Sequence, residues 1–323
     1  MEPALKSSSL PTLARRFLLF PYRLSLVAFQ DLRLSRSFER RGLVPISLDL
    51  PAAAATIHIW APAARRHSFP PLVLIHGFGA NAKWQWDRQI GPLSRFFDLY
   101  IPDLLYFGGS RSEGKDFSVA FQSRCVAAAM RQLGVSKYSV VGISYGGYVA
   151  YRMAADEGPG VVDRVVIMTA GIGATPEETK ALVEKERRDV SEILLPRKPE
   201  DLMALMRRSM YRPPRWMPTF LLRDFIEVMY TERRKERVEL LKELLQNSVG
   251  MDPIPVLDQE TLVMWGDQDN VFPLHLAHRL QRHLGEKSRL EIIADAGHAL
   301  QLEKPNRVTD LIENFMLDKL NIS

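Results

Sequence analysis

The chain has 323 residues, of which 46% are hydrophobic and 25% charged, the composition of a globular protein that buries a substantial core. Its single cysteine, Cys125, excludes a disulfide framework and a cysteine-based metal site; the apolar helical pattern around it favours a buried structural thiol. Residues 1–44 carry eight basic and three acidic residues, which account for the whole net charge of +5. The remainder is balanced, so we expect no nucleic-acid surface.

The N-terminal segment, residues 1–44, contains an apolar run from Phe17 to Phe29. The run is too short to span a bilayer, and Pro21 and Arg23 interrupt it. It also lacks the small-residue cleavage site of a secretory signal. Three interpretations stay open: a helix lying in a membrane interface with its arginines toward anionic headgroups, an organelle transit peptide, or a helix packed on the domain. We expect an intracellular protein, cytoplasmic or peripheral on a membrane, with organelle targeting as an alternative.

From about residue 54 the chain alternates strand-like and helix-like segments, which is typical of an α/β fold with a mostly parallel sheet and helices on both faces. Continuous apolar character in the middle strands predicts burial on both faces. The expected strands are Ala54–Trp60, Leu72–Ile75, Leu99–Asp103, Tyr138–Ile143, Val161–Met168, Thr261–Trp265 and Ser288–Ile293. The expected core helices are Phe117–Leu133, Leu274–Leu284 and Arg307–Leu320.

The strands ending near Met168 and starting at Thr261 are too far apart for one crossover helix, so an insertion lies between them. Residues 176–250 predict a helical cap made of Glu177–Leu195, Pro199–Met210, Pro218–Tyr230 and Lys235–Leu245. Methionines and aromatic residues gather there, including Met206, Met210 and Trp216. They can pack the core of the insertion itself, form a flexible apolar roof over a lipophilic substrate, or do both.

The stretch Gly142-Ile143-Ser144-Tyr145-Gly146 leads an apolar strand into a helical pattern. A strand-to-helix turn this tight strains the serine backbone and holds its hydroxyl above the sheet, and the glycines leave room for neighbouring elements. The context favours Ser144 as a nucleophile over an ordinary strand–loop–helix junction.

A serine nucleophile needs a base and an orienting carboxylate. His298 follows the last strand in a Gly-flanked loop, and Asp267 and Asp269 follow the strand before it. Parallel strands deliver these loops to one edge of the sheet. Backbone N–H groups of Tyr145 and of Phe78, in His76-Gly77-Phe78-Gly79, are candidates for an oxyanion hole. We expect the His76 side chain to bond nearby loop backbone rather than to take part in chemistry.

Taken together, these motifs resemble those of α/β-hydrolase-fold enzymes over roughly residues 54–320. His76-Gly77-Phe78-Gly79, the serine turn, Trp265-Gly266-x-x-Asp269-x-x-x-Pro273 and Gly297-His298-x-x-x-x-Glu303-x-Pro305 match in order and spacing. The Trp-Gly-x-x-Asp pattern selects Asp269 over Asp267 as the acid. The resemblance implies a core of residues 45–175 and 251–323 with a cap at 176–250, similar to monoacylglycerol-lipase-like and carbon–carbon-bond hydrolases.

One position departs from the pattern. Relatives often carry glycine where this chain has Tyr106, which either lines the pocket or only shapes its loop. Together with the cap pattern, the resemblance suggests a substrate site lined by Gly77, Tyr106, Met206, Met210 and Trp216.

The resemblance implies hydrolysis of a lipophilic carboxylic ester through a Ser144–His298–Asp269 acyl-enzyme mechanism that needs no metal or cofactor. The alternatives are a carbon–carbon hydrolase or lyase with the same triad, or a non-catalytic receptor or scaffold. Epoxide and haloalkane chemistry is disfavoured, because those relatives place aspartate at the elbow. The expected partners are the small-molecule ester and an anionic membrane touched by residues 1–44. The substrate and the oligomeric state stay open.

Overall fold

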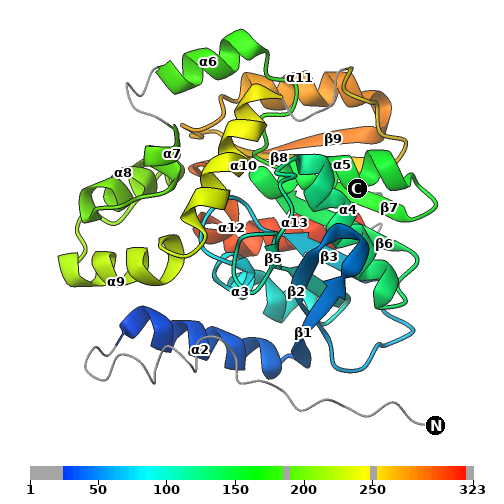
Figure 1. The fold of residues 1–323 in the computed structure, drawn as a ribbon. Helices are drawn as coiled ribbons and strands as arrows, with labels where there is room; N and C mark the ends of the chain where they lie inside the picture. Colours follow the sequence, from blue (N-terminus) through cyan, green and yellow to red (C-terminus); the bar gives the residue numbers. More distant parts are fainter. Residues whose placement is uncertain (1–24, 185–189, 248–252, 318–323) are drawn as a thin grey trace.

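A computed structural model describes residues 25–184, 190–247 and 253–317. Within them, a nine-stranded sheet has the order β1-β2-β4-β3-β6-β7-β8-β9, with β5 paired to β2 (Figure 1). β1, β2 and β4 pair antiparallel, and the sheet from β4 to β9 is parallel. The strands are β1 (Leu43–Leu50), β2 (Ala55–Pro62), β3 (Pro71–Ile75), β4 (Asp98–Pro102), β5 (Arg111–Ser112), β6 (Tyr138–Ile143), β7 (Val162–Met168), β8 (Glu260–Gly266) and β9 (Ser288–Ile293).

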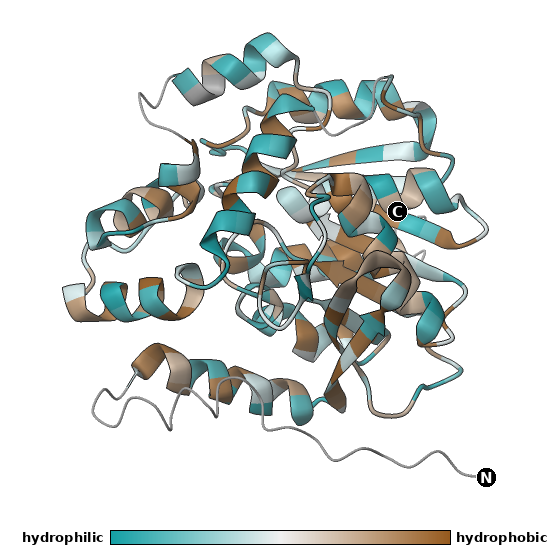
Figure 2. Cartoon of the chain, viewed as in Figure 1, coloured by the Kyte–Doolittle hydropathy of each residue, from teal (hydrophilic) through white to brown (hydrophobic). Residues whose placement is uncertain are grey.

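Two hydrophobic clusters sandwich the sheet. In β3, Val73 and Ile75 belong to one cluster and Leu72 and Leu74 to the other, and all four are fully buried. Burial on both faces therefore explains the continuous apolar run, as predicted. Figure 2 shows the central strands as the brown interior of the molecule.

Helices cover both faces, which confirms the predicted α/β architecture. One cluster lies under α4 (Val119–Gln132), α5 (Tyr145–Glu157) and α11 (His275–Leu284). The other lies under α3 (Ala82–Leu93), α12 (Leu300–Glu303) and α13 (Pro305–Met316). Cys125 of α4 is a free, buried thiol whose pKa burial raises to about 11. Short 3-10 turns occur at Pro51–Ala53 and Gly285–Lys287.

The predicted cap consists of α6 (Pro176–Glu184), α7 (Val190–Leu194), α8 (Pro199–Ser209), α9 (Thr219–Tyr230) and α10 (Arg234–Gln246). The predicted helix Glu177–Leu195 is thus two helices, between which lie residues outside the described ranges. A third hydrophobic cluster joins the cap helices and includes Met203, Met229 and Leu241, with Met206 packed against it. Met203, Met206, Met217 and Met229 of the cap therefore pack in a core of its own.

The N-terminal helix α2 (Leu26–Glu39) packs on α3 and on cap helix α9 (Figure 1). The interpretation as a helix packed on the domain thus applies to this part of the segment; residues 1–24 lie outside the described residues. β1 pairs with β2 along its whole length, so the expected boundary between residues 44 and 45 falls inside a strand. No helix in the described ranges is both long and apolar enough to cross a bilayer.

Candidate active site

Ser144 stands at the tip of a strained turn between β6 and α5. Its backbone has φ 52° and ψ −121°, a region that non-glycine residues rarely enter. A Cβ on Gly142 would lie 2.2 Å from the Gly146 oxygen, and one on Gly146 would lie 2.3 Å from the His76 oxygen. Glycines are required here because backbone atoms, which cannot move aside, occupy the space. The half-buried Ser144 side chain is thereby held at the edge of the sheet.

His298 and Asp269 form a hydrogen-bonded pair in the loops after β9 and β8. His298 Nδ1 lies 3.0 Å from Asp269 Oδ2, and the side chains are 11% and 0% exposed. The second carboxylate oxygen, Oδ1, accepts the backbone N–H groups of Val271 (2.7 Å) and Phe272 (3.0 Å). Because the carboxylate is an acceptor, Nδ1 carries the hydrogen and Nε2 is left able to accept a proton. Asp267 instead accepts the Ala296 N–H at 3.4 Å.

Strand register carries the serine turn and the histidine loop to the same edge. Ile143 pairs with Met168, which pairs with Met264 of β8. Ser144 N–H donates to the Met168 oxygen (2.8 Å), and the next residue, Thr169, donates its Oγ1–H to the His298 oxygen (3.2 Å). Within the described ranges Ser144 Oγ and His298 form no hydrogen bond with each other, a contact that often tightens only in a substrate complex.

The predicted oxyanion donors belong to two loops that meet at Ser144. A Cβ added to Gly77 would lie 3.2 Å from the Ser144 Cβ. The Phe78 and Tyr145 rings contact edge to face, with centroids 6.0 Å apart. Among the described residues, neither the Phe78 N–H nor the Tyr145 N–H has a hydrogen-bond acceptor. Both donors are therefore available to a ligand.

His76 is fully buried and bonds only backbone. Nε2 accepts the Leu104 N–H at 2.9 Å, so Nδ1 must be the donor to the Gly77 oxygen at 2.7 Å. Burial lowers the pKa of His76, which keeps this neutral tautomer. The contacts agree with the expected role in holding the loop.

The cap reaches the histidine loop through backbone contacts. Ala299 N–H donates to the Ser209 oxygen at 2.9 Å. The Glu303 carboxylate accepts the N–H groups of Gly297 (2.7 Å) and of Arg212 in the cap (3.1 Å). Phe78 packs against both the core cluster and the cap cluster. The end of α8 is thus attached to the loop that carries His298.

The predicted substrate residues have different surroundings. Gly77 lies beside Ser144, and Met206 and Met210 are half-buried in the cap. Trp216 is 76% exposed. Tyr106 has φ 72°, its ring packs on Phe117, and its hydroxyl donates to the Gly114 oxygen at 3.3 Å. These are the contacts of a loop-shaping residue, one of the two options left open by the sequence.

Several polar residues around the site were not singled out from the sequence. Asp103 accepts from Ala82 N–H, Gly109 N–H and His58 Nδ1 at 2.9–3.0 Å. Burial is the largest single effect and raises its pKa, but the hydrogen bond and charge of His58, together with smaller contributions from His76 and the Ala82 N–H, lower the pKa to about 2. Arg208 of α8 lies near enough to Asp269 to feel its charge, although burial lowers the arginine pKa.

The described residues contain no group of three His, Cys, Asp or Glu side chains suited to a metal ion.

The chain is similar to several known proteins over most of its length. Mouse monoacylglycerol lipase ABHD6 is 26% identical over 259 residues, which is 76% of this chain and 75% of the mouse protein. A membrane phospholipase A structure superposes with a TM-score of 0.77 at 24% identity, covering 96% of both chains. A 2-hydroxy-6-oxo-6-phenylhexa-2,4-dienoate hydrolase from Rhodococcus sp. strain RHA1 superposes with a TM-score of 0.70 at 23% identity, covering 85% of this chain and 99% of that one.

The family model described as the alpha/beta hydrolase fold matches residues 70–305. This range holds the serine turn, the His298–Asp269 pair and the whole cap, and it is well over half of the chain. The chain belongs to the α/β-hydrolase fold family.

Proposed function

We propose that the protein is a serine hydrolase that cleaves lipophilic carboxylic esters. The observation that carries the proposal is the strained, glycine-walled Ser144 turn at the same sheet edge as the His298–Asp269 pair. Strain of this kind persists only when the surrounding structure enforces it, and it clusters at functional sites. The similarity to a monoacylglycerol lipase supports an ester as the substrate.

In the proposed mechanism, Ser144 Oγ attacks the ester carbonyl carbon while His298 Nε2 takes the hydroxyl proton. Asp269 holds the imidazole through Nδ1–H and stabilises its positive charge. The oxyanion accepts hydrogen bonds from the free N–H groups of Phe78 and Tyr145. His298 then protonates the leaving alcohol, and a water activated by the same imidazole hydrolyses the acyl-enzyme.

Ser144→Ala tests the proposal with a short-chain p-nitrophenyl ester and a fluorophosphonate probe. We expect kcat to fall by at least about 10³-fold and covalent labelling to disappear. Ser123→Ala, which removes a buried serine of α4, is the matched control and should keep both. Equal activity of Ser144→Ala and wild type would reject the enzyme and favour a non-catalytic scaffold. Labelling at Ser144 without ester turnover would favour carbon–carbon cleavage.

The lipophilic preference is inferred from the cap. Phe78 lies between the core and cap clusters, and the half-buried Met206 packs against the cap cluster. Flexible thioethers adapt to irregular apolar ligands. We expect kcat/KM to rise as the acyl chain lengthens from about two to ten carbons, because each buried CH₂ contributes about 0.8 kcal/mol. A steady fall over that series would contradict the preference.

We further propose that α2 touches an anionic membrane with its outer face. Leu26, Phe29 and Leu32 are 52%, 57% and 41% exposed, and helical spacing puts them on one face with the exposed Arg33, Arg36 and Arg40. Within the described ranges these arginines form no ion pair. Apolar side chains beside unpaired cations suit the interface of a bilayer with anionic lipid.

Vesicle sedimentation with and without anionic lipid tests this contact in the full-length protein. Phe29→Glu should weaken binding to anionic vesicles by about tenfold or more. Val256→Glu, at a 60% exposed site away from α2, should bind like wild type. Binding that is equal for both variants would rule out α2 as the contact, whatever the outcome for Ser144.

A further inference from the structure

We infer that Gln85 and Asp31 are positioning residues for the oxyanion hole: Gln85 of α3 orients the peptide that bears the Phe78 N–H, and Asp31 of α2 fixes the start of α3. The inference rests on the proposed ester hydrolysis. Neither residue belongs to the motifs that indicated the site. Both act through backbone geometry, at a distance from the reacting atoms.

The Phe78 N–H belongs to the same planar peptide as the Gly77 carbonyl. In a trans peptide the N–H and C=O point in opposite directions, so whatever fixes the carbonyl also fixes the direction of the N–H. Two donors hold the Gly77 oxygen: His76 Nδ1 at 2.7 Å and Gln85 Nε2 at 3.1 Å. Because these two donors hold the Gly77 carbonyl on one side of the peptide, the Phe78 N–H points to the other side, where it has no acceptor among the described residues.

The Gln85 side chain forms three hydrogen bonds with the backbone of this loop. Its Oε1 accepts the Gly77 N–H at 2.8 Å, and its Nε2 also donates to the Gly79 oxygen at 2.7 Å. Gly79 and Ala80 both have positive φ, 112° and 49°, so the loop bends sharply between Phe78 and α3. Ala80, a non-glycine residue with positive φ, keeps that conformation only where surrounding contacts enforce it, and Gln85 supplies contacts to the loop beside it.

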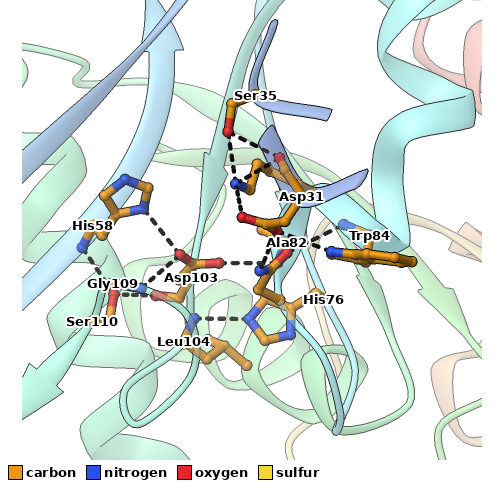
Figure 3. Close-up of polar contacts among 12 residues, drawn as sticks. Asp31, Ser35, His58, His76, Ala82, Trp84, Asp103, Leu104, Gly109 and Ser110 are labelled. Atoms are coloured by element: carbon orange, nitrogen blue, oxygen red, sulfur yellow. Dashed lines mark hydrogen bonds and ion pairs between the residues drawn. The ribbon is translucent and has the colours of Figure 1, made fainter. Parts of the chain in front are cut away.

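Asp31 anchors the first turn of α3, from which Gln85 projects. Its Oδ1 accepts from Asn81 Nδ2 at 3.2 Å and from Trp84 Nε1 at 2.9 Å, and its Oδ2 pairs with Lys83 Nζ at 2.7 Å (Figure 3). Asp31 is only 2% exposed. Asn81 is the N-cap of α3 and ends the oxyanion loop.

Asp31, on the buried face of α2, therefore fixes the first turn of α3, which directly follows the loop that bears the Phe78 N–H. Asp103 accepts the N–H of Ala82, the first residue of α3, at 2.9 Å (Figure 3). The start of α3 is held from two directions by buried carboxylates. Movement of α2 would reach the Phe78 N–H through residues 81–85, without any contact between α2 and the substrate.

Gln85→Met is the direct test, with Gln89→Met as the matched control. Gln89 is a buried glutamine one turn further along α3 that donates to the Gln301 oxygen rather than to the loop. Losing one oxyanion donor costs about 10²–10³-fold in kcat. We expect misorientation in Gln85→Met to lower kcat by about 10–10²-fold with KM within about twofold, and Gln89→Met to keep the wild-type kcat.

An alkyl boronic acid, which forms a tetrahedral adduct with a serine hydroxyl, separates positioning from general destabilisation. For Gln85→Met its inhibition constant should rise by the same factor by which kcat/KM falls. A fall in melting temperature like that of Gln89→Met, with unchanged kcat and inhibition constant, would overturn the role of Gln85. If Ser144→Ala stays active the proposed function itself fails, and the two failures are thus distinguishable.

The double variant Asp31→Ala/Lys83→Met tests the contacts of Asp31 with the first turn of α3, and it leaves no buried charge unpaired because both partners of the ion pair are removed. We expect a smaller effect of the same kind, about 3–10-fold in kcat, and a matching rise in the boronic acid inhibition constant. Ser35→Ala is the control, because it removes a hydroxyl that accepts from Lys83 Nζ at 2.8 Å and donates to the Asp31 backbone oxygen at 3.2 Å but leaves the Asp31 and Lys83 side chains in place. Wild-type kcat in a folded double variant would exclude Asp31 from the positioning of the loop.

Discussion

The serine turn and the cap are held in place by different kinds of atoms. At the turn, backbone oxygens lie within 2.2–2.5 Å of where Gly142 and Gly146 would carry a Cβ, so residue type is dictated by main-chain geometry. In the cap, methionines such as Met203, Met206 and Met229 pack through flexible side chains, and Trp216 is 76% exposed. A geometry fixed by backbone atoms leaves a pattern in the sequence that can be recognised, whereas adaptable packing leaves none.

Gly146→Ala should be the most damaging single change. The new Cβ would meet backbone oxygens of His76 and Ile75 at 2.3 and 2.5 Å, and neither can shift without moving β3. We expect loss of folded, active protein, measured by circular dichroism and ester turnover. Gly160→Ala, whose Cβ would have no atom within 4 Å, should behave like wild type. An active Gly146→Ala variant would contradict the claim that backbone geometry dictates the residue type at the turn.

Asp269→Asn should retain the fold and lose most activity. The amide would no longer hold His298 in the productive tautomer, which lowers kcat by about 10⁴-fold in a related triad. Asp267→Asn changes the neighbouring carboxylate, which bonds Ala296 instead, and should lower kcat by less than tenfold. Steady-state kinetics of the two variants compare these acids directly. Equal losses would show that the assignment of the acid is wrong.

Acid unfolding should distinguish a buried carboxylate at the sheet edge from a partly exposed one in the cap. Asp103 has a folded-state pKa of about 2, below its ordinary value, so its stabilisation is present above about pH 4 and lost as the pH falls toward 2. The lowered pKa corresponds to about 2 kcal/mol of unfolding free energy. In Asp103→Asn, the free energy of unfolding measured by urea titration should depend less steeply on pH between about pH 4 and pH 2.

Glu178 of α6 is the matched case, since its bond to Arg279 also lowers its pKa to about 2. Its side chain is 28% exposed, and solvent screens such pairs. Glu178→Gln should therefore change the acid slope much less than Asp103→Asn. Equal slopes in the two variants would contradict the assigned difference in burial.

Trp216→Ala should have the smallest effect on stability. The side chain is 76% exposed, so the free energy of unfolding should change by no more than about 0.5 kcal/mol. Any effect should appear as a loss of kcat/KM for long-chain esters only. Trp265→Ala removes a fully buried indole bonded to the Phe272 oxygen and should cost about 3–5 kcal/mol. A large destabilisation by Trp216→Ala would mean that the cap is as tightly packed as the core.

The sequence predicted the parallel core because buried strands such as Leu72–Ile75 are continuously apolar, and glycine spacing marked the serine turn. It missed α3 because the buried face of that helix includes Lys83, Gln89 and Gly91, which hide the hydrophobic period. It missed β1 although Val44, Ile46 and Leu48 alternate with more exposed residues, because a proline such as Pro45 inside a run argues against a strand and is tolerated only at a sheet edge.

The contacts behind the site are harder to predict than the site itself. Asp31 pairs with Lys83, which is 52 positions away in the sequence, and no local sequence pattern predicts that these two buried charges form an ion pair. Similarly, Gln85 on α3 gives no sign that it will bond Gly77 and Gly79. Such pairings follow from tertiary packing, which only the folded chain specifies.

The full-length pairing of β1 with β2 has a practical consequence for shortening this protein. Removing residues 1–44 would delete α2 and the first residues of the edge strand. Ala61 and Pro62 of β2, which pair with Val44 and Leu43, would then lose their partners, and the opened edge could pair with a second chain. Such a truncation would promote aggregation and be mistaken for loss of a membrane anchor, so a shortened chain should begin before Ser25, the N-cap of α2.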